Sequence, residues 1–164
     1  MLDGEIDLAR NDLLMEWQEL LNKVKQGDAK ALARGISLIE NEYEGYNALL
    51  QSLSANTTKI IGITGPPGAG KSTLTDALID LLVNAGKKVG VLCIDPSSPF
   101  NLGALLGDRI RMSEWYTHPN VFIRSLATRG SMGGLHPKII EISDLMKTFP
   151  FDHIIIETVG RRTK

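Results

Sequence analysis

The segment from residue 65 to residue 72 constrains this chain more than any other. It reads Gly-Pro-Pro-Gly-Ala-Gly-Lys-Ser and matches the G-x-x-x-x-G-K-[ST] pattern of a phosphate-binding loop at every fixed position. The apolar, β-branched run at 59–64 predicts a buried strand before the loop. After the loop, apolar residues recur at helical spacing up to Gly86, which can end a helix. They are Leu74, Ala77, Leu78, Leu81 and Leu82. Strand, loop and helix together favour a phosphate site over a glycine-rich turn that carries Lys-Ser by chance.

Each residue type in this loop suits the binding of a nucleotide. The glycines let the backbone turn tightly and direct its N–H groups inward, and the helix N-terminus favours an anion. We expect Lys71 to reach the β- and γ-phosphates and the Ser72 hydroxyl to ligate Mg²⁺. The predicted nucleotide-binding residues are Gly65, Pro66, Pro67, Gly68, Ala69, Gly70, Lys71, Ser72 and Thr73.

Composition places the chain among ordinary globular proteins. A length of 164 residues suffices for one α/β domain with a small appendage. The net charge of −1 gives no case for nucleic acid or a membrane as the main partner. Cys93 is the single cysteine, so no disulfide can form within the chain, and the acidic N-terminus lacks the basic start of a leader peptide. We therefore expect a reduced, cytoplasmic setting.

Residues 1–54 are predicted to form a helical extension. An apolar stripe from Leu13 to Val24 ends at Gly27, Asp28 can cap a second helix, and the apolar spacing from Tyr43 to Leu53 suggests a third. These helices are expected to pack on one another and on the nucleotide domain, and a partner-binding surface is the alternative. The polar residues that follow predict a connection, so that 55–164 forms the P-loop nucleotide-binding domain.

The rest of the chain alternates strands and helices. Apolar runs predict strands at 89–94, 121–124 and 153–158, and helices are expected after Asp108 and from Pro137. Such alternation predicts an α/β fold with a mostly parallel sheet flanked by helices. Ligands of such sheets bind at the carboxyl ends of the strands, where the glycine loop, Asp95 and Glu157 all fall.

Three acidic residues are candidates for metal binding or catalysis, and each could instead have only a structural role. Glu157 ends an apolar strand, where it could hold Mg²⁺ or orient water, although strand-end carboxylates are often simply solvated. Asp95 has the same placement after its own strand. Asp108 could be only a helix N-cap. Arg109, Arg111 and Arg129 could contact phosphate, and the three histidines show no spacing for zinc or a catalytic triad.

Four longer segments resemble one family of P-loop proteins, the MeaB/ArgK/MMAA GTPases that accompany methylmalonyl-CoA mutase. The segments are Asp95-Pro-Ser-Ser-Pro-Phe, Leu106-Gly-Asp-Arg-Ile-Arg-Met, Phe122-Ile-Arg-Ser-Leu-Ala-Thr-Arg-Gly and Ile156-Glu-Thr-Val-Gly. The resemblance implies a P-loop GTPase with GTP as substrate and Mg²⁺ as cofactor. Such proteins act as chaperones that couple GTP hydrolysis to loading and protection of adenosylcobalamin on the mutase. On the family pattern, the catalytic residues are Lys71, Asp95, Asp108 and Glu157, and the metal ligands are Ser72, Asp95, Asp108 and Glu157.

The sequence departs from the family pattern after Gly160. The family continues with Val-Gly-Gln-Ser-Glu, whereas this sequence reads Arg-Arg-Thr-Lys and holds no Asn-Lys-x-Asp segment to read guanine. We expect a truncated or frame-altered product that lacks the C-terminal strands and the arm through which the family forms homodimers. Such a chain should expose a sheet edge and an apolar face, and should bind GTP and ATP weakly and alike. The alternatives are a kinase or ATPase linked to lysine/arginine/ornithine transport, and a nucleotide-binding module without turnover.

Overall fold

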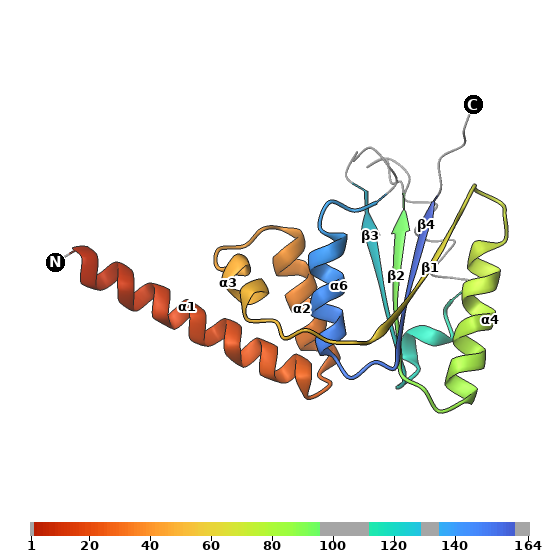
Figure 1. The fold of residues 1–164 in the computed structure, drawn as a ribbon, viewed down its shortest axis with the longest axis horizontal. Coiled ribbons are helices and arrows are strands. Elements are labelled where there is room, and N and C mark those ends of the chain that lie inside the picture. Colours follow the sequence, from red (N-terminus) through yellow and green to blue (C-terminus); the bar gives the residue numbers. More distant parts are fainter. Residues whose placement is uncertain (1, 96–111, 129–134, 160–164) are drawn as a thin grey trace. The chain divides into compact units, whose positions relative to one another are not determined.

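The computed structural model describes residues 2–95, 112–128 and 135–159, with side chains for residues 13–94, 112–128 and 135–158 (Figure 1). Contacts divide the chain into two compact units. The helical unit comprises residues 1–57 and 140–150, and the sheet unit comprises residues 58–139 and 151–164. Residues 140–150 thus group with the N-terminal helices, and the domain boundary after residue 54 stays a prediction.

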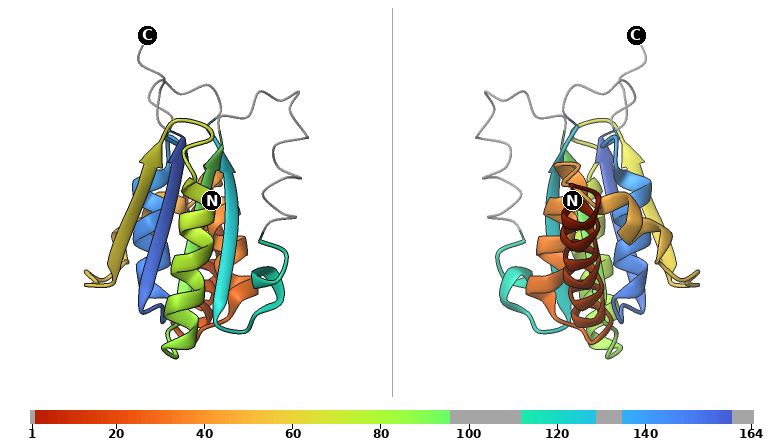
Figure 2. Two further views of the ribbon diagram at one scale, coloured as in Figure 1. Left: turned by 90° about the vertical axis from the view of Figure 1, so that its right-hand side faces the viewer. Right: turned by 90° about the vertical axis from the view of Figure 1, so that its left-hand side faces the viewer.

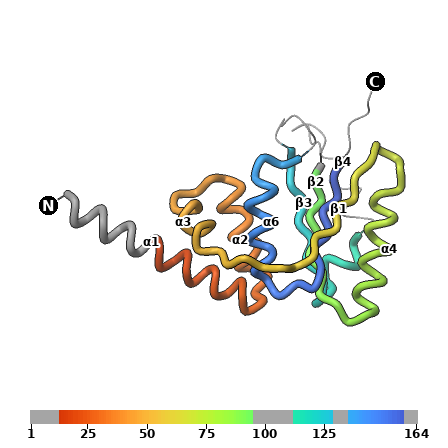
Figure 3. Tube along the Cα trace, in the orientation of Figure 1, coloured from red at the N-terminus to blue at the C-terminus, as the bar shows by residue number. Residues whose placement is uncertain are grey.

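The helical unit contains α1 (Leu2–Lys25), α2 (Ala29–Glu40), α3 (Tyr46–Gln51) and most of α6 (Ile139–Thr148), traced in Figure 3. Gly35 of α2 lies against Leu145 of α6, where an added Cβ would be 2.8 Å from Leu145 Cδ2. A glycine at this position therefore permits the close approach of the two helices. The buried apolar side chains of this unit include Trp17, Leu21, Val24, Leu32, Ile36, Ile39, Leu49, Ile142, Leu145 and Met146.

The residues before α2 and α3 mark where these two helices begin. Asp28 caps α2 as predicted, because its Oδ1 accepts hydrogen bonds from the N–H groups of Lys30 at 2.8 Å and Ala31 at 3.0 Å. The prediction that Tyr43 belongs to the third helix is wrong, since Tyr43 precedes α3 and is 63% exposed. Gly45, with φ of 87°, is the N-cap of α3 and separates that helix from Tyr43.

The sheet unit confirms the predicted parallel sheet. Its strands are β1 (Lys59–Gly65), β2 (Val89–Asp95), β3 (Val121–Ala127) and β4 (His153–Val159), in the order β1-β4-β2-β3. All neighbouring pairs are parallel, with Gly65 opposite Val159 and Asp95 opposite Ala127. The carboxyl ends of the four strands therefore form one edge, as Figure 1 shows.

The expectation that the first strand is buried is wrong. β1 is an edge strand of the described sheet, paired with β4 on one side only. Within β1 only Ile63 is buried, and Ile60 is 39% exposed. An apolar, β-branched run predicts a strand, but it does not reveal how many neighbours that strand has.

Helix α4 (Lys71–Asn84) contacts β1, β2 and β4, and lies across one face of the sheet (Figure 2, left). Its buried residues are Thr75 and Ile79. The helix predicted after the loop is confirmed, and two of the leucines whose spacing predicted it, Leu74 and Leu81, are 58% and 66% exposed. The core beneath α4 is built from Ile63, Ile79, Val89, Val91, Cys93, Met112, Trp115 and Ile155.

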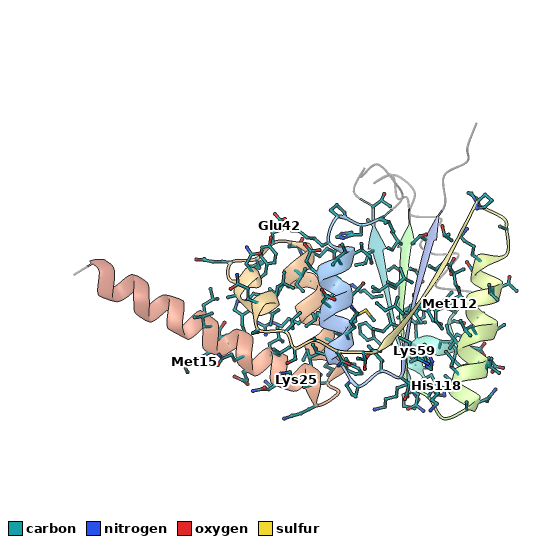
Figure 4. All side chains as sticks on the ribbon, in the orientation of Figure 1. Met15, Lys25, Glu42, Lys59, Met112 and His118 are labelled. Atoms are coloured by element: carbon teal, nitrogen blue, oxygen red, sulfur yellow. The ribbon has the colours of Figure 1, made fainter. Side chains whose placement is uncertain are left out.

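A 3₁₀ helix, η1 (Trp115–Thr117), follows a turn at 112–114. The predicted helix from Asp108 begins outside the described residues, and its described remainder is this turn and η1 rather than an α-helix. Trp115 Nε1 donates to Asp76 Oδ1 of α4 at 2.6 Å, which ties η1 to the helix that follows the loop. Figure 4 labels His118 and Lys59 at the amino-end edge of the sheet, opposite the glycine loop.

None of the helices described here has the length and apolar character needed to cross a membrane.

Candidate nucleotide-binding site

The loop between β1 and α4 turns by means of glycines in left-handed conformation. Gly68 and Gly70 have φ of 79° and 83°, which side chains with a Cβ rarely adopt. A Cβ added at either position would meet no atom within 4 Å. Glycine is therefore required here by the backbone and not by neighbouring side chains, and the space around the loop is open.

The loop leads directly into the N-terminus of α4. Gly70 is the N-cap, and the first helical bond runs from Leu74 N to Gly70 O at 3.0 Å. The N–H groups of residues 71–73 precede this bond, so helix geometry gives them no acceptor within α4. Together with the helix dipole they make the loop a favourable place for an anion.

Lys71 places its charge on the same loop. Its Nζ donates to Pro66 O at 3.0 Å, and the Ala69 N–H donates to the same oxygen at 3.3 Å. The lysine side chain thus folds back over the loop. A cation, helix N–H groups and left-handed glycines are brought together within eight consecutive residues.

Glu157 reaches the loop from the centre of the sheet. It belongs to β4, which lies between β1 and β2, and it is only 8% exposed. The Ser72 hydroxyl donates to Glu157 Oε1 at 2.9 Å. The prediction that the glycine loop and Glu157 share one edge is therefore confirmed, whereas their chemical roles stay predictions.

Thr75 belongs to this cluster and was not predicted. Its hydroxyl lies 2.7 Å from Glu157 Oε2 and 3.0 Å from Lys71 O, and the residue is fully buried. Thr75 follows Ser72 by three positions, a spacing that puts both on one face of a helix. The sequence signal that could have identified Thr75 is a polar residue three positions after Ser72. The apolar spacing of the leucines drew attention to the other residues of the helix instead.

The other predicted acids are placed only in part. Asp95 ends β2 at the loop edge, where its neighbour on β3 is Ala127, and only its backbone is described. Asp108 lies outside the described residues, as do Arg109, Arg111 and Arg129. The described structure therefore joins the loop, Ser72 and Glu157, and leaves the other assignments as predictions.

The described residues fit a magnesium ion that binds together with phosphate. Mg²⁺ prefers oxygen ligands, and protein sites for it often use one or two side chains together with substrate phosphates. Ser72 offers such an oxygen, because a hydroxyl that donates its proton to Glu157 keeps its acceptor lone pairs. Within 2–95, 112–128 and 135–159 no group of three or more His, Cys, Asp or Glu side chains could hold a metal. Phosphate oxygens and water would supply further ligands, and Asp95 and Asp108 stay predicted ligands outside the described side chains.

Known proteins resemble this chain over most of its length. GTPase ArgK of Escherichia coli is 36% identical over 149 residues, which are 87% of this chain and 45% of ArgK. A fused isobutyryl-CoA mutase of Geobacillus kaustophilus is 41% identical over 152 residues, 85% of this chain and 14% of that protein. The chain spans less than half the length of ArgK, and even less of the fused mutase.

A solved structure supports the fold. The crystal structure of a LAO/AO transport system kinase matches with a TM-score of 0.64 at 28% identity, over 89% of this chain and 44% of that one. Residues 32–162 match the family described as methylmalonyl-CoA mutase-associated GTPase MeaB. The family match spans the loop, α4 and β4, and the chain belongs to the MeaB family of P-loop GTPases.

Proposed function

We propose that this chain binds GTP and Mg²⁺ at the loop of residues 65–73 and hydrolyses the nucleotide. The observation that carries the proposal is the hydrogen bond from Ser72 to Glu157, which joins the phosphate loop to an acid of the central strand. Membership of a GTPase family supports the choice of nucleotide. Asp95 and Asp108 are proposed to complete the site.

Each described residue would have a defined task. The N–H groups at the start of α4 and the ammonium of Lys71 would bind the phosphate oxygens and oppose their charge. Glu157 would hold the Ser72 hydroxyl by accepting its proton. Bound Mg²⁺ would neutralise charge on the β- and γ-phosphates. Catalysis by this chain would then rest on positioning and charge stabilisation, as in other phosphoryl transfers.

We further propose that the complete protein serves an adenosylcobalamin-dependent acyl-CoA mutase. The family is described as associated with methylmalonyl-CoA mutase, and one relative is a fused isobutyryl-CoA mutase. The proposed role is that of a chaperone that uses GTP for loading and protection of the cofactor. Co-purification of the complete protein with such a mutase, and its dependence on GTP, would test this part.

The nucleotide site is tested by calorimetric titration of GTP into the chain, with Mg²⁺ and with EDTA, together with a phosphate-release assay. We expect Mg²⁺ to tighten binding, and Ser72→Ala to remove that gain while binding in EDTA persists. Ser37→Ala, which removes a hydroxyl from the helical unit, should behave as wild type. GTP binding that is indifferent to both Mg²⁺ and Ser72 would contradict the proposal.

A second candidate is an ATP-dependent kinase or ATPase, which the description of the matching solved structure favours. Titration with ATP in the same experiment separates the two. Transfer of phosphate to an added acceptor, rather than to water, would support the kinase. Binding of either nucleotide without phosphate release would support a module without turnover.

A further inference from the structure

Thr75 is a fully buried polar residue in the helix that follows the phosphate loop. It lies in α4, one helical turn after Lys71. Its Oγ1 is 2.7 Å from Glu157 Oε2 and 3.0 Å from the carbonyl oxygen of Lys71. Neither the phosphate-loop motif nor the chemistry described above assigns a task to this side chain.

The hydroxyl of Thr75 has one proton and two acceptors within reach. Hydrogen bonds to a carboxylate are shorter and stronger than those to a neutral carbonyl, and the contact with Glu157 is the shorter of the two. The proton therefore goes to Glu157 Oε2. A bond back to the carbonyl four residues earlier is a weak interaction by comparison.

Glu157 consequently receives one donor from α4 on each carboxylate oxygen. Ser72 donates to Oε1 at 2.9 Å and Thr75 donates to Oε2 at 2.7 Å. A single donor would leave the carboxylate free to rotate about its last torsion, whereas donors on both oxygens fix its plane. The plane of the carboxylate in turn decides which way the Ser72 hydroxyl points its proton and its lone pairs.

We propose that Thr75 is a positioning residue for the metal–nucleotide site, acting through Glu157 on the Ser72 hydroxyl. This inference rests on the proposed function, because it concerns how the Ser72 oxygen is presented to Mg²⁺. Thr75 would act through its bond to Glu157 and not by direct contact with metal or nucleotide. Partners that orient a ligand from behind typically change metal affinity by about 10- to 100-fold when they are removed.

The test compares variants that separate the hydroxyl from the packing of the side chain. Thr75→Val keeps the branched shape and removes the hydroxyl, whereas Thr75→Ser keeps the hydroxyl and removes a methyl group. Thr75→Ala is a second variant without the hydroxyl, for use if the valine protein does not fold. GTP affinity is measured by calorimetry across a range of Mg²⁺ concentrations and in EDTA, and thermal unfolding is followed by circular dichroism.

We expect Thr75→Val to weaken the apparent affinity for Mg²⁺ at least about tenfold. Its GTP affinity in EDTA should stay within about twofold of wild type, and Thr75→Ser should restore the Mg²⁺ response. Unchanged Mg²⁺ dependence in a folded protein without the hydroxyl would overturn the proposal. Equal losses with Mg²⁺ and EDTA, in valine and serine variants alike, would also overturn it and leave only a packing role. A wild-type chain that binds no GTP, or binds it without regard to Mg²⁺, would instead contradict the proposed function itself.

Discussion

Ser72 and Glu157 are separated by 85 positions in the sequence, yet the Ser72 hydroxyl donates to Glu157 Oε1 at 2.9 Å. The contact links the first turn of α4 to the strand at the centre of the sheet. It depends on the pairing of β4 with β1, which brings Glu157 beside the loop that follows β1. The order of the strands, and not only the motif, therefore assembles this site.

This contact predicts the behaviour of Glu157→Gln. The amide keeps the size of the side chain but removes its charge and can accept on one oxygen only. We expect the Mg²⁺-dependent part of GTP affinity to fall by about tenfold or more, with little change in GTP binding in EDTA. Calorimetric titration measures both. An unaltered Mg²⁺ dependence of GTP affinity in this variant would show that Glu157 does not contribute to the site.

The buried face of α4 predicts unequal costs for two of its apolar residues. Ile79 is fully buried in the core cluster, whereas Leu81 is 66% exposed. Ile79→Ala should lower the free energy of unfolding by about 2–5 kcal/mol, because it leaves a cavity. Leu81→Ala should change it by no more than about 0.5 kcal/mol. Urea denaturation compares them, and equal costs would mean that α4 is rotated about its axis.

The close approach of α2 and α6 predicts the effect of Gly35→Ala. The new Cβ would lie 2.8 Å from Leu145 Cδ2, in a buried contact. Overpacking of a core commonly costs about 1–3 kcal/mol, which should exceed the gain of about 1 kcal/mol in helix propensity. We expect a net loss of stability in urea denaturation.

The matched control for Gly35→Ala is the double variant with Leu145→Ala. Truncation of Leu145 removes the colliding atom, so the alanine at position 35 should then cost less than it does alone. Additive effects of the two substitutions would show that Gly35 and Leu145 are not in contact.

The N-terminus of α2 predicts the effect of removing its cap. Asp28→Ala deletes the acceptor for the N–H groups of Lys30 and Ala31, and should cost about 1 kcal/mol. Asp28→Asn and Asp28→Ser keep a side-chain oxygen and should retain most of the stability. Thermal unfolding of the three variants provides the comparison. A loss shared by all three would assign the effect to charge rather than to capping.

The sequence predicted those parts of the molecule that rest on local chemistry. The glycine loop, the four strands and the cap at Asp28 follow from residue types at fixed spacing, and the structure confirms them. The common edge of the parallel strands also brought Glu157 to the loop, since Ser72 bonds to it.

The parts that were missed depend on neighbours that are distant in the sequence. Leu74 and Leu81 belong to the apolar spacing that predicted α4, yet both are exposed, and α4 turns Thr75 towards β4, where it bonds to Glu157. Spacing alone does not show whether the buried face of a helix consists of leucines or includes a threonine whose hydroxyl is hydrogen-bonded. In the same way, the composition of β1 gave no sign that it would form the edge of the described sheet.

The central claim is that the charge of Lys71 serves the phosphates of a nucleotide, and one measurement tests it most directly. GTP is titrated calorimetrically into wild type, Lys71→Ala and the control Lys87→Ala, which removes an exposed lysine after α4. Circular dichroism establishes that each is folded. We predict that Lys71→Ala abolishes binding while its fold persists, and that Lys87→Ala binds as wild type does. Unchanged GTP affinity in folded Lys71→Ala would contradict the account.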